Sequence, residues 1–246
     1  MPVHIIAKPE DIAKRAIIAG DPARIEQLAG MLENPYLVNS NRGYITYTGY
    51  YKGERVTVAT HGVGAPSAAI VVEELKMLGV EVIIRLGTTG ALINDLEIGD
   101  IVIPTGASYP YGGNTTSMYI PDGCMAAVPN PIVLGKLIEK AKIFNARFTA
   151  GPIFSSDAFY AEDPLFVRRW ALRGMISVEM ECAAIFIIGL LRKIKTGALL
   201  IVSNNLTREN GKEIPVAENL KKYVDIASRI VLEAIVEIPV NKVASY

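Results

Sequence analysis

The chain has 246 residues, half of them apolar, so it can bury one full hydrophobic core and form a single domain over residues 1–246. Its 25 basic and 25 acidic residues balance, which excludes the basic footprint of a nucleic-acid-binding protein and favours a small ligand held locally. No apolar stretch reaches membrane-spanning length, no signal peptide is recognisable, and Cys124 and Cys182 lie far apart, so we expect a cytoplasmic protein without a metal site.

Short aliphatic runs bounded by glycine, proline or polar residues alternate along the chain with longer segments of helical pattern. Such runs are typical of buried strands, and the alternation favours a mostly parallel or mixed sheet covered by helices on both faces. In chain order we expect strands over residues 16–19, 44–49, 51–56, 56–60, 82–86, 101–104, 150–154, 176–180 and 198–203, and helices over 66–78, 131–144, 164–172, 182–193 and 216–235. The two strands that flank Lys52-Gly53 are expected to form a hairpin, and the polar segment 105–130 an active-site or interface loop.

Two glycine-rich turns, each expected after a strand and each carrying an arginine, are the strongest functional signals. The first contains Gly20 and Arg24, and the second contains Arg85 and Thr88. Glycine lets backbone N–H groups approach an anion, and guanidinium is well shaped for a phosphate. Ligands of open α/β sheets bind where strands end, and neither turn matches a dinucleotide or P-loop pattern. Ordinary strand-to-loop turns with surface arginines are the alternative.

Two carboxylates, Glu179 and Glu181, stand at the end of an otherwise apolar strand. Alternation places them on the same side if the strand continues, whereas a helix that starts near Glu181 would separate them. A carboxylate pair there can accept hydrogen bonds from vicinal hydroxyl groups such as those of a ribose. A salt-bridged strand end is the alternative.

Two other polar segments follow predicted strands. Phe159 and Tyr160, after Ser155-Ser156-Asp157, can form a flat wall for a base ring, with core packing of Phe159 as the alternative. Asn204 can present its neutral amide to a heterocycle, although a plain turn fits the composition equally well. The two histidines, His4 and His61, complete no catalytic set and are too few for most metal sites.

Six motifs together resemble one family. They are Gly20-Asp21-Pro22-x-Arg24, Asn41-Arg42-Gly43, Thr60-His61-Gly62-x-Gly64-x-Pro66-Ser67, Arg85-x-Gly87-Thr88-Thr89-Gly90, Ser156-Asp157-x-Phe159-Tyr160 and Val178-Glu179-Met180-Glu181. Their order resembles the purine nucleoside, methylthioadenosine and uridine phosphorylase group, most of all its archaeal-type methylthioadenosine/purine nucleoside phosphorylases. The resemblance runs from His4 to about Asn205. It implies an α/β fold whose central mixed sheet closes partly into a barrel flanked by helices.

The resemblance also implies an assembly and a reaction. The assembly is a homohexamer built as a trimer of dimers, and the mean hydropathy of +0.30 likewise indicates buried subunit interfaces. The reaction is reversible phosphorolysis, in which inorganic phosphate attacks C1′ of a nucleoside as the N-glycosidic bond breaks. Positioning and charge stabilisation are then the protein's part, and no metal or organic cofactor is required.

Each matching residue acquires an implied role. The phosphate site comprises Gly20, Arg24, Arg85 and Thr88, with Arg42 reaching in from a neighbouring subunit. The ribose is held by Glu181 beside Met180, with His4 of the neighbour at its 5′ end. The base is contacted by Phe159, Val178, Glu179 and Asn204, and the catalytic roles fall to Arg85, Glu181 and Asn204.

Asn204 departs from the pattern of the purine-cleaving members of this hexameric group, which usually carry an aspartate that protonates N7 of the leaving purine. An amide can only donate a hydrogen bond there. Uridine phosphorylases also lack that aspartate, and Glu213-Ile214-Pro215 resembles their C-terminal stretch, but residues 160–163 lack their uracil-reading Gln-x-Arg. We therefore expect purine nucleosides, with methylthioadenosine among them, ahead of uridine. A water-using nucleosidase and a non-catalytic nucleoside-binding protein are further alternatives.

Overall fold

The computed structural model describes all residues except 1, 113, 162, 209–216 and 241–246. The strands are β1 (Arg15–Ala19), β2 (Glu33–Asn39), β3 (Thr46–Tyr51), β4 (Glu54–Thr60), β5 (Val82–Ala91), β6 (Ile101–Ser108), β7 (Phe148–Ser155), β8 (Ser177–Glu179) and β9 (Lys195–Asn205). The helices are α1 (Pro22–Ala29), α2 (Ala65–Met77), α3 (Thr115–Tyr119), α4 (Pro131–Ile143), α5 (Phe166–Leu172), α6 (Cys182–Arg192) and α7 (Ala217–Glu237), with short 3-10 turns η1 (Pro9–Asp11) and η2 (Asn41–Gly43).

The nine strands found among the described residues belong to one mixed sheet that closes on itself at one end. The strand order is β2-β3-β4-β1-β5-β8-β7-β6-β9, and β5 pairs with β9 as well as with β8. Strands β5, β8, β7, β6 and β9 therefore form a closed barrel, and β1 to β4 extend from its wall as an open sheet. This confirms the expected α/β class and the partly closed mixed sheet.

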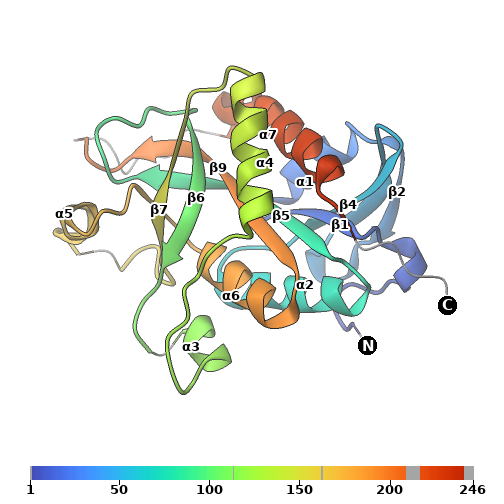
Figure 1. The fold of residues 1–246 in the computed structure, drawn as a ribbon, viewed down its shortest axis with the longest axis horizontal. Helices are drawn as coiled ribbons and strands as arrows, with labels where there is room; N and C mark the ends of the chain where they lie inside the picture. The colour runs from blue at the N-terminus through green and yellow to red at the C-terminus, as the bar shows by residue number, and fades with distance from the viewer. Residues whose placement is uncertain (1, 113, 162, 209–216, 241–246) are drawn as a thin grey trace.

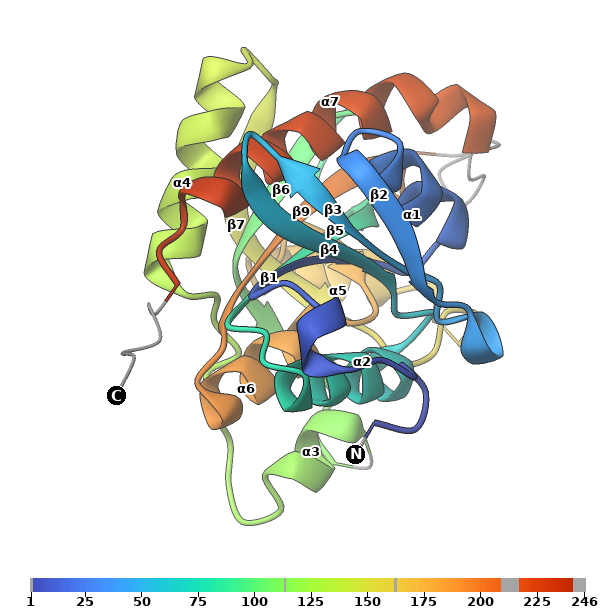
Figure 2. The ribbon, with the colours of Figure 1, turned by 90° about the vertical axis from the view of Figure 1, so that its right-hand side faces the viewer.

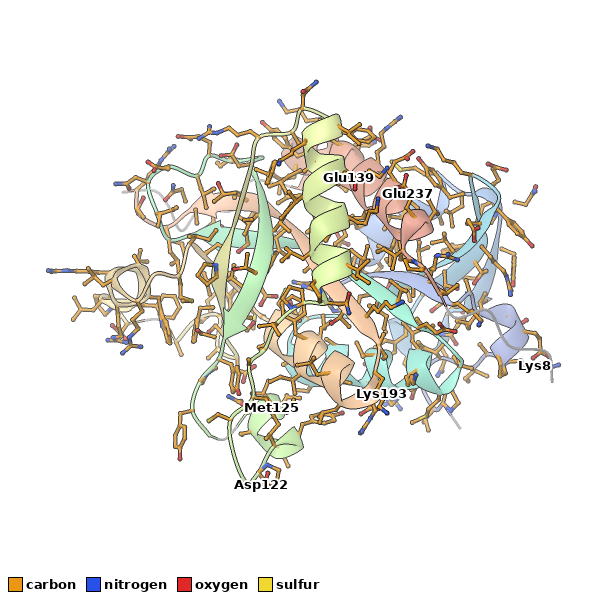
Figure 3. All side chains as sticks on the ribbon, in the orientation of Figure 1. Lys8, Asp122, Met125, Glu139, Lys193 and Glu237 are labelled. Carbon is orange, nitrogen blue, oxygen red and sulfur yellow. The ribbon has the colours of Figure 1, made fainter. Side chains whose placement is uncertain are left out.

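Helices cover the sheet in two layers (Figures 1 and 2). Helices α1, α4 and α7 pack on one face, and α2 and α6 pack on the other with α3 outside them. Each layer buries its own aliphatic cluster against the strands, as the alternation of apolar runs predicts. Figure 3 labels Glu139 of α4 and Glu237 of α7 at the surface. Lys136 of α4 forms ion pairs with both, at 2.9 Å and 3.0 Å.

Every helix expected from the sequence is present, and so are the expected strands, except that residues 51–56 and 56–60, expected as two strands, form the single strand β4. The ends differ by a few residues, apart from β5 and β6, which run further. The hairpin of β3 and β4 turns through Lys52 and Gly53, whose φ angles of 51° and 78° are those of a type I′ turn. The expected start of the last helix at Val216 and the stretch Glu213-Ile214-Pro215 lie outside the described residues.

The second glycine-rich segment, residues 85–90, was expected to be a turn, and this prediction is wrong: it lies inside β5. The glycine provides space rather than a change of direction. A Cβ atom on Gly87 would stand 2.8 Å from both the guanidinium carbon of Arg85 and a methyl group of Leu200. The segment stays extended because β9 pairs with β5 along the whole length of β5.

The prediction for segment 105–130 also needs correction at its start and centre. Strand β6 continues through Pro104 to Ser108, and a register shift against β7 between Pro104 and Gly106 accommodates the residue that has no N–H to donate. Helix α3 then forms within the segment, capped by Asn114. None of the described helices is long and apolar enough to span a bilayer.

Candidate active site

Arg85 is the centre of a buried charge cluster. Its side chain leaves β5, folds over Gly87 and is almost completely buried. Its Nε donates to Glu179 Oε2 at 3.3 Å, and its Nη2 forms ion pairs with Glu179 at 3.2 Å and with Glu181. Burial acts to lower the pKa of Arg85, but the negative charges of Glu181 and Glu179 outweigh it and raise that pKa above its usual value. The guanidinium is therefore held as a fixed cation.

The two carboxylates reach Arg85 from different elements. Glu179 ends β8 and accepts hydrogen bonds from the N–H groups of Glu181 at 2.8 Å and Cys182 at 3.0 Å, which begin α6, and from the Ser155 hydroxyl. Glu181 is the N-cap residue of α6, and its Oε1 accepts from Gly64 N at 2.7 Å. A helix does start beside Glu181, yet the two side chains converge on one cation.

The environment differs between the two carboxylates. Burial raises the pKa of Glu181, and the charge of Glu179 raises it further, while Arg85 lowers it. Both oxygens of Glu179 are already bonded by protein groups, which agrees with the salt-bridged alternative for this residue. Its expected contact with a base stays a prediction. Glu181, bonded by one amide and one guanidinium, is the better placed of the two to accept from a ligand.

His61 completes the shell of Arg85. The residue directly follows β4 and is fully buried, with its Nε2 2.8 Å from Nη1 of Arg85. Burial lowers the pKa of His61 well below its usual value, and the charge of Arg85 lowers it further. Because a guanidinium can only donate, Nε2 of a neutral His61 is the acceptor.

Arg24 and Gly20 lie beside this cluster. Arg24, in the first turn of α1, donates from Nη1 to the carbonyl oxygen of Leu86 at 3.1 Å. Burial, followed by the positive charge of Arg85, lowers the pKa of Arg24 to about 10. Its Nε is buried without a hydrogen-bond partner, and it forms no ion pair with a carboxylate in the described part of the chain. Two neighbouring cations, one of them unpaired, favour an anion between them.

The loop geometry around Gly20 supports the same position. A Cβ atom at Gly20 would stand 2.9 Å from the carbonyl oxygen of Gly62, so the loops after β1 and β4 can meet only at a glycine. Thr88, the other expected phosphate residue, is half-buried on β5 opposite Ile201.

The expected base-contacting residues are only partly brought together. Gly90 of β5 pairs with Val178 of β8 on one side and with Asn204 of β9 on the other, so these three form one row across the barrel. The Ser203 hydroxyl donates to Asn204 Oδ1 at 3.0 Å. Phe159 lies half-exposed in the turn after β7, edge-on to Tyr160 at 5.0 Å, rather than in the core. Met180 lies in the short connection between β8 and α6.

His4 and Arg42 lie together on an arm made of the N-terminal segment and η2. Asn41 Nδ2 donates to the carbonyl oxygen of His4 at 3.1 Å. Arg42 has a left-handed backbone with φ of 54°, is exposed, and forms no hydrogen bond or ion pair with the described residues. Neither residue pairs with Arg85 or Glu181 of its own chain.

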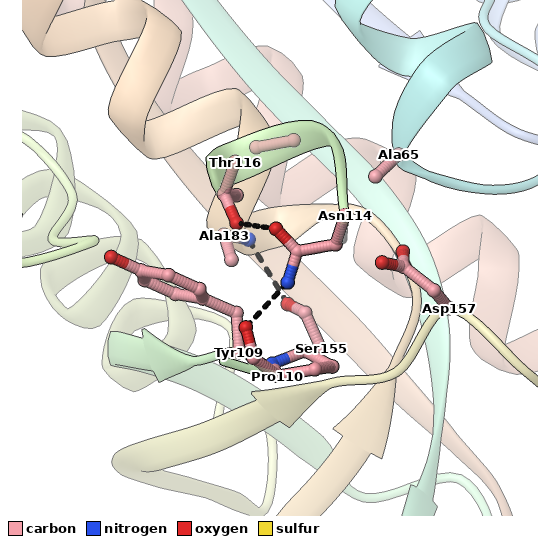
Figure 4. A pocket seen from close by; sticks show the side chains of 9 residues that line it. Ala65, Tyr109, Pro110, Asn114, Thr116, Ser155, Asp157 and Ala183 are labelled. Atoms are coloured by element: carbon pink, nitrogen blue, oxygen red, sulfur yellow. Dashed lines mark hydrogen bonds between the residues drawn. The ribbon is translucent and has the colours of Figure 1, made fainter. Parts of the chain in front are cut away.

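A groove of about 790 Å³ runs between this arm and the loop after β7, lined by His4, Gly64, Met77, Met118 and Asp157 among others. Beside it lies a small pocket formed by Asn114, Ser155 and Asp157 (Figure 4). Burial raises the pKa of Asp157, and the charge of Glu179 adds to the rise. The arm and the loop that carries Phe159 therefore border one open, largely apolar groove.

Comparison with known proteins places the chain in a family. Residues 14–236 match the family described as the Phosphorylase superfamily. The chain is 37% identical to guanosine phosphorylase of Halorubrum lacusprofundi, covering 94% of this chain and 97% of that protein. It is 38% identical to uridine phosphorylase of Treponema pallidum, covering 83% of each. It is 36% identical to the DeoD-type purine nucleoside phosphorylase of Caldanaerobacter subterraneus, covering 95% and 99%.

Comparison of the fold with solved structures indicates the same family. The crystal structure of purine nucleoside phosphorylase from Toxoplasma gondii in complex with immucillin-H superposes with a TM-score of 0.87, at 28% identity over 96% of this chain and 95% of that one. The chain belongs to the phosphorylase superfamily. Within it, the chain is a nucleoside phosphorylase, which confirms the expected enzyme class.

Sequence reasoning missed two residues of the site. His61 was given no role, although its position directly after a strand and within the Thr60-His61-Gly62 motif is a signal that it lies near the site. Ser155 was seen only as part of a polar loop. It bonds both Glu179 and the amide of Ala183, and only the three-dimensional closure of β7 onto β8 and α6 shows this.

Proposed function

We propose that this chain binds inorganic phosphate between Arg24, Arg85 and the loop at Gly20, and uses it to cleave purine nucleosides. The observation that carries the proposal is the pair of neighbouring guanidinium groups, of which that of Arg85 is buried and that of the half-buried Arg24 has a buried Nε without a hydrogen-bond partner. Burying unpaired positive charge is costly, and a phosphate dianion relieves that cost. Thr88 supplies a further hydroxyl on the same strand as Arg85.

In the proposed reaction a phosphate oxygen forms a bond to C1′ while the bond from C1′ to the base nitrogen breaks. Glu181 accepts hydrogen bonds from the ribose hydroxyl groups beside Met180, which orients C1′ toward the phosphate. The electron pair of the broken bond leaves with the base, and Asn204 donates an N–H hydrogen bond to the base as negative charge develops. Phosphate is a substrate here, and the reaction requires no cofactor.

The base preference is the finer part of the proposal. Without an acid at position 204, a 6-oxopurine, which delocalises negative charge onto oxygen, is a better leaving group than a 6-aminopurine. The similarity to a guanosine phosphorylase supports this order. Uridine is the second candidate, favoured by the same argument and by the uridine phosphorylase relative. Methylthioadenosine, a 6-aminopurine, ranks below both.

We also propose that the enzyme works in the cytoplasm as a homo-oligomer, a hexamer built as a trimer of dimers. His4 and Arg42 share one exposed arm and pair with no catalytic group of their own chain, as expected if they serve a neighbour's site. The adjoining groove exposes Met77 and Met118, apolar surface that a second copy would cover.

The proposal is tested by incubating the purified protein with inosine, guanosine, adenosine, methylthioadenosine and uridine, each with and without phosphate. We expect phosphate-dependent release of hypoxanthine and guanine to be fastest. Base release without phosphate would identify a nucleosidase. Tight nucleoside binding without turnover would identify a binding protein, and either outcome would contradict the proposal.

A further inference from the structure

Glu74 is a buried carboxylate that the reaction proposed above does not use. It lies on α2 and is 6% exposed, and no arginine or lysine pairs with it in the described part of the chain. Its partners are the first residues of the chain. Oε1 accepts from Val3 N at 2.9 Å and Oε2 from Ile5 N at 2.7 Å, and both oxygens accept from His4 N, at 3.1 and 3.0 Å.

The same carboxylate also holds the His4 ring. Nδ1 of His4 lies 2.8 Å from Glu74 Oε1, and the ring stands edge-on to Tyr44 at 5.3 Å. Asn41 Nδ2 donates to the carbonyl oxygen of His4 from the opposite side. Backbone and ring are therefore fixed at once, and among the described residues Glu74 is the one group that hydrogen-bonds to both.

The hydrogen bond determines which ring nitrogen faces outward. A carboxylate can only accept, so Nδ1 carries the proton and Nε2 of the neutral ring is left as an acceptor. Burial acts to raise the pKa of Glu74, but the hydrogen bonds from Ile5, His4 and Val3 lower it overall, so the group is ionised at neutral pH. The tautomer of His4 is thus determined by its hydrogen bond to Glu74 rather than by solvent.

We propose that Glu74 is a positioning residue that makes Nε2 of His4 an acceptor for the 5′-hydroxyl group of the substrate. The inference rests on the proposed function, in which His4 faces the 5′ end of the sugar in a neighbouring site. An acceptor there selects sugars with a 5′-OH over sugars without a donor, because a 5′-deoxy or 5′-methylthio carbon leaves Nε2 unpaired.

The test compares inosine with 5′-deoxyinosine. In the wild type, kcat/KM for inosine should exceed that for the deoxy substrate. Glu74→Gln keeps the size of the side chain but can turn an amide N–H toward Nδ1, which permits the other tautomer. We expect this variant to reduce the ratio of the two kcat/KM values by about three- to tenfold, the loss typical of one hydrogen bond.

Asn39→Ala is the matched structural control. Asn39 Oδ1 accepts from Ile6 N at 3.0 Å and its Nδ2 donates to the carbonyl oxygen of Tyr44 at 2.6 Å, so this variant loosens the same N-terminal segment while the Glu74–His4 hydrogen bond stays available. It should lower activity on both substrates alike. His4→Ala should reduce the ratio as Glu74→Gln does, and the double variant should reduce it no further, since Glu74 acts through His4.

An unchanged ratio in Glu74→Gln, or an additional loss in the double variant, would overturn the inference while leaving the phosphorylase proposal intact. A wild type that releases no hypoxanthine from inosine would instead overturn the proposed function, and the inference with it. The two failures are therefore distinguished by the wild-type arm alone.

Discussion

His61 shows how one buried side chain links the charge cluster to the stability of the fold. The ring is neutral because burial and the neighbouring charges of Arg85 and Arg24 keep its pKa well below the usual value. Arg85 needs an acceptor on that side, and His61 supplies one at 2.8 Å. Protonation would replace this hydrogen bond with two adjacent buried cations.

A pH dependence of stability follows. The folded state resists protonation of His61, whereas the unfolded chain takes up the proton below its pKa of about 6.5, so stability falls as pH falls. From about pH 7.5 to about pH 5 this residue should cost about 2 kcal/mol. The variant His61→Asn keeps an acceptor oxygen but cannot titrate. Urea titrations at both pH values should show that its free energy of unfolding falls by about 2 kcal/mol less than that of the wild type. Equal losses in the two proteins would contradict the assignment.

The proposed role of Asn204 in base preference is tested at the same scale. Asn204→Asp introduces an acid that can protonate N7 of a leaving purine, a step that the amide cannot supply. We expect the kcat/KM ratio of adenosine to inosine to rise by about tenfold, at the low end of what general acids contribute. Asn145→Asp, which adds a carboxylate at an exposed position after α4 where the described residues bond only the backbone N–H, is the control and should leave the ratio unchanged. A wild type that already prefers adenosine would show that the proton comes from elsewhere.

At the scale of the elements, the sequence predicts a strand best where an apolar run is bounded by residues that end a strand. The strands of the barrel are apolar runs that end at glycine, proline or polar residues, and all of them are found. Strand β2 was not predicted because it is an edge strand with mostly exposed residues and no apolar alternation. Helix α1 was not predicted because the segment at Gly20 and Arg24 was interpreted only as a phosphate-binding turn. The signal was present, since Asp21 caps the helix by accepting from Ala23 N at 2.9 Å.

Residues 85–90 illustrate a local signal that tertiary structure overrides. Glycines at this density are typical of a turn, but β9 pairs with the whole of β5 and keeps it extended. The glycine then serves the site, because it leaves room for the Arg85 side chain to fold back toward its carboxylates. The expected turn is therefore wrong, while the phosphate-binding role expected for Arg85 and Thr88 stays a prediction.

Glycine also decides how closely α4 packs on the barrel. A Cβ atom at Gly197 of β9 would stand 2.4 Å from Cγ1 of Val133 of α4. Gly197→Ala should therefore destabilise the protein by about 1–3 kcal/mol through overpacking. Gly135→Ala lies on the exposed side of the same helix with nothing within 4 Å, and should stabilise it by about 0.5–1 kcal/mol. Urea unfolding of both variants checks the pair, and a neutral Gly197→Ala would show that α4 can shift.

At the scale of the whole molecule, the candidate site draws on segments that are distant in sequence. The motifs singled out Arg24, Arg85 and Glu181, because charged residues next to apolar runs are visible in a sequence. They could not show that Arg85 and Glu181 form an ion pair, that His61 shares the cation, or that Glu74 holds His4. Those contacts depend on how strands and helices far apart in the chain converge, and no local pattern encodes them.

Two residues of the proposed site, His4 and Arg42, are expected from a second copy, and mixed oligomers test this. Arg85→Ala and Arg42→Ala should each be nearly inactive alone. In a mixed dimer, one site then lacks both arginines and the other has both, so coexpression of the two variants should restore about a quarter of wild-type activity for random pairing. Arg85→Ala with Glu181→Ala, two changes in the same half-site, should restore none. Equal recovery in both mixtures, or a fully active monomer, would mean that each chain completes its own site.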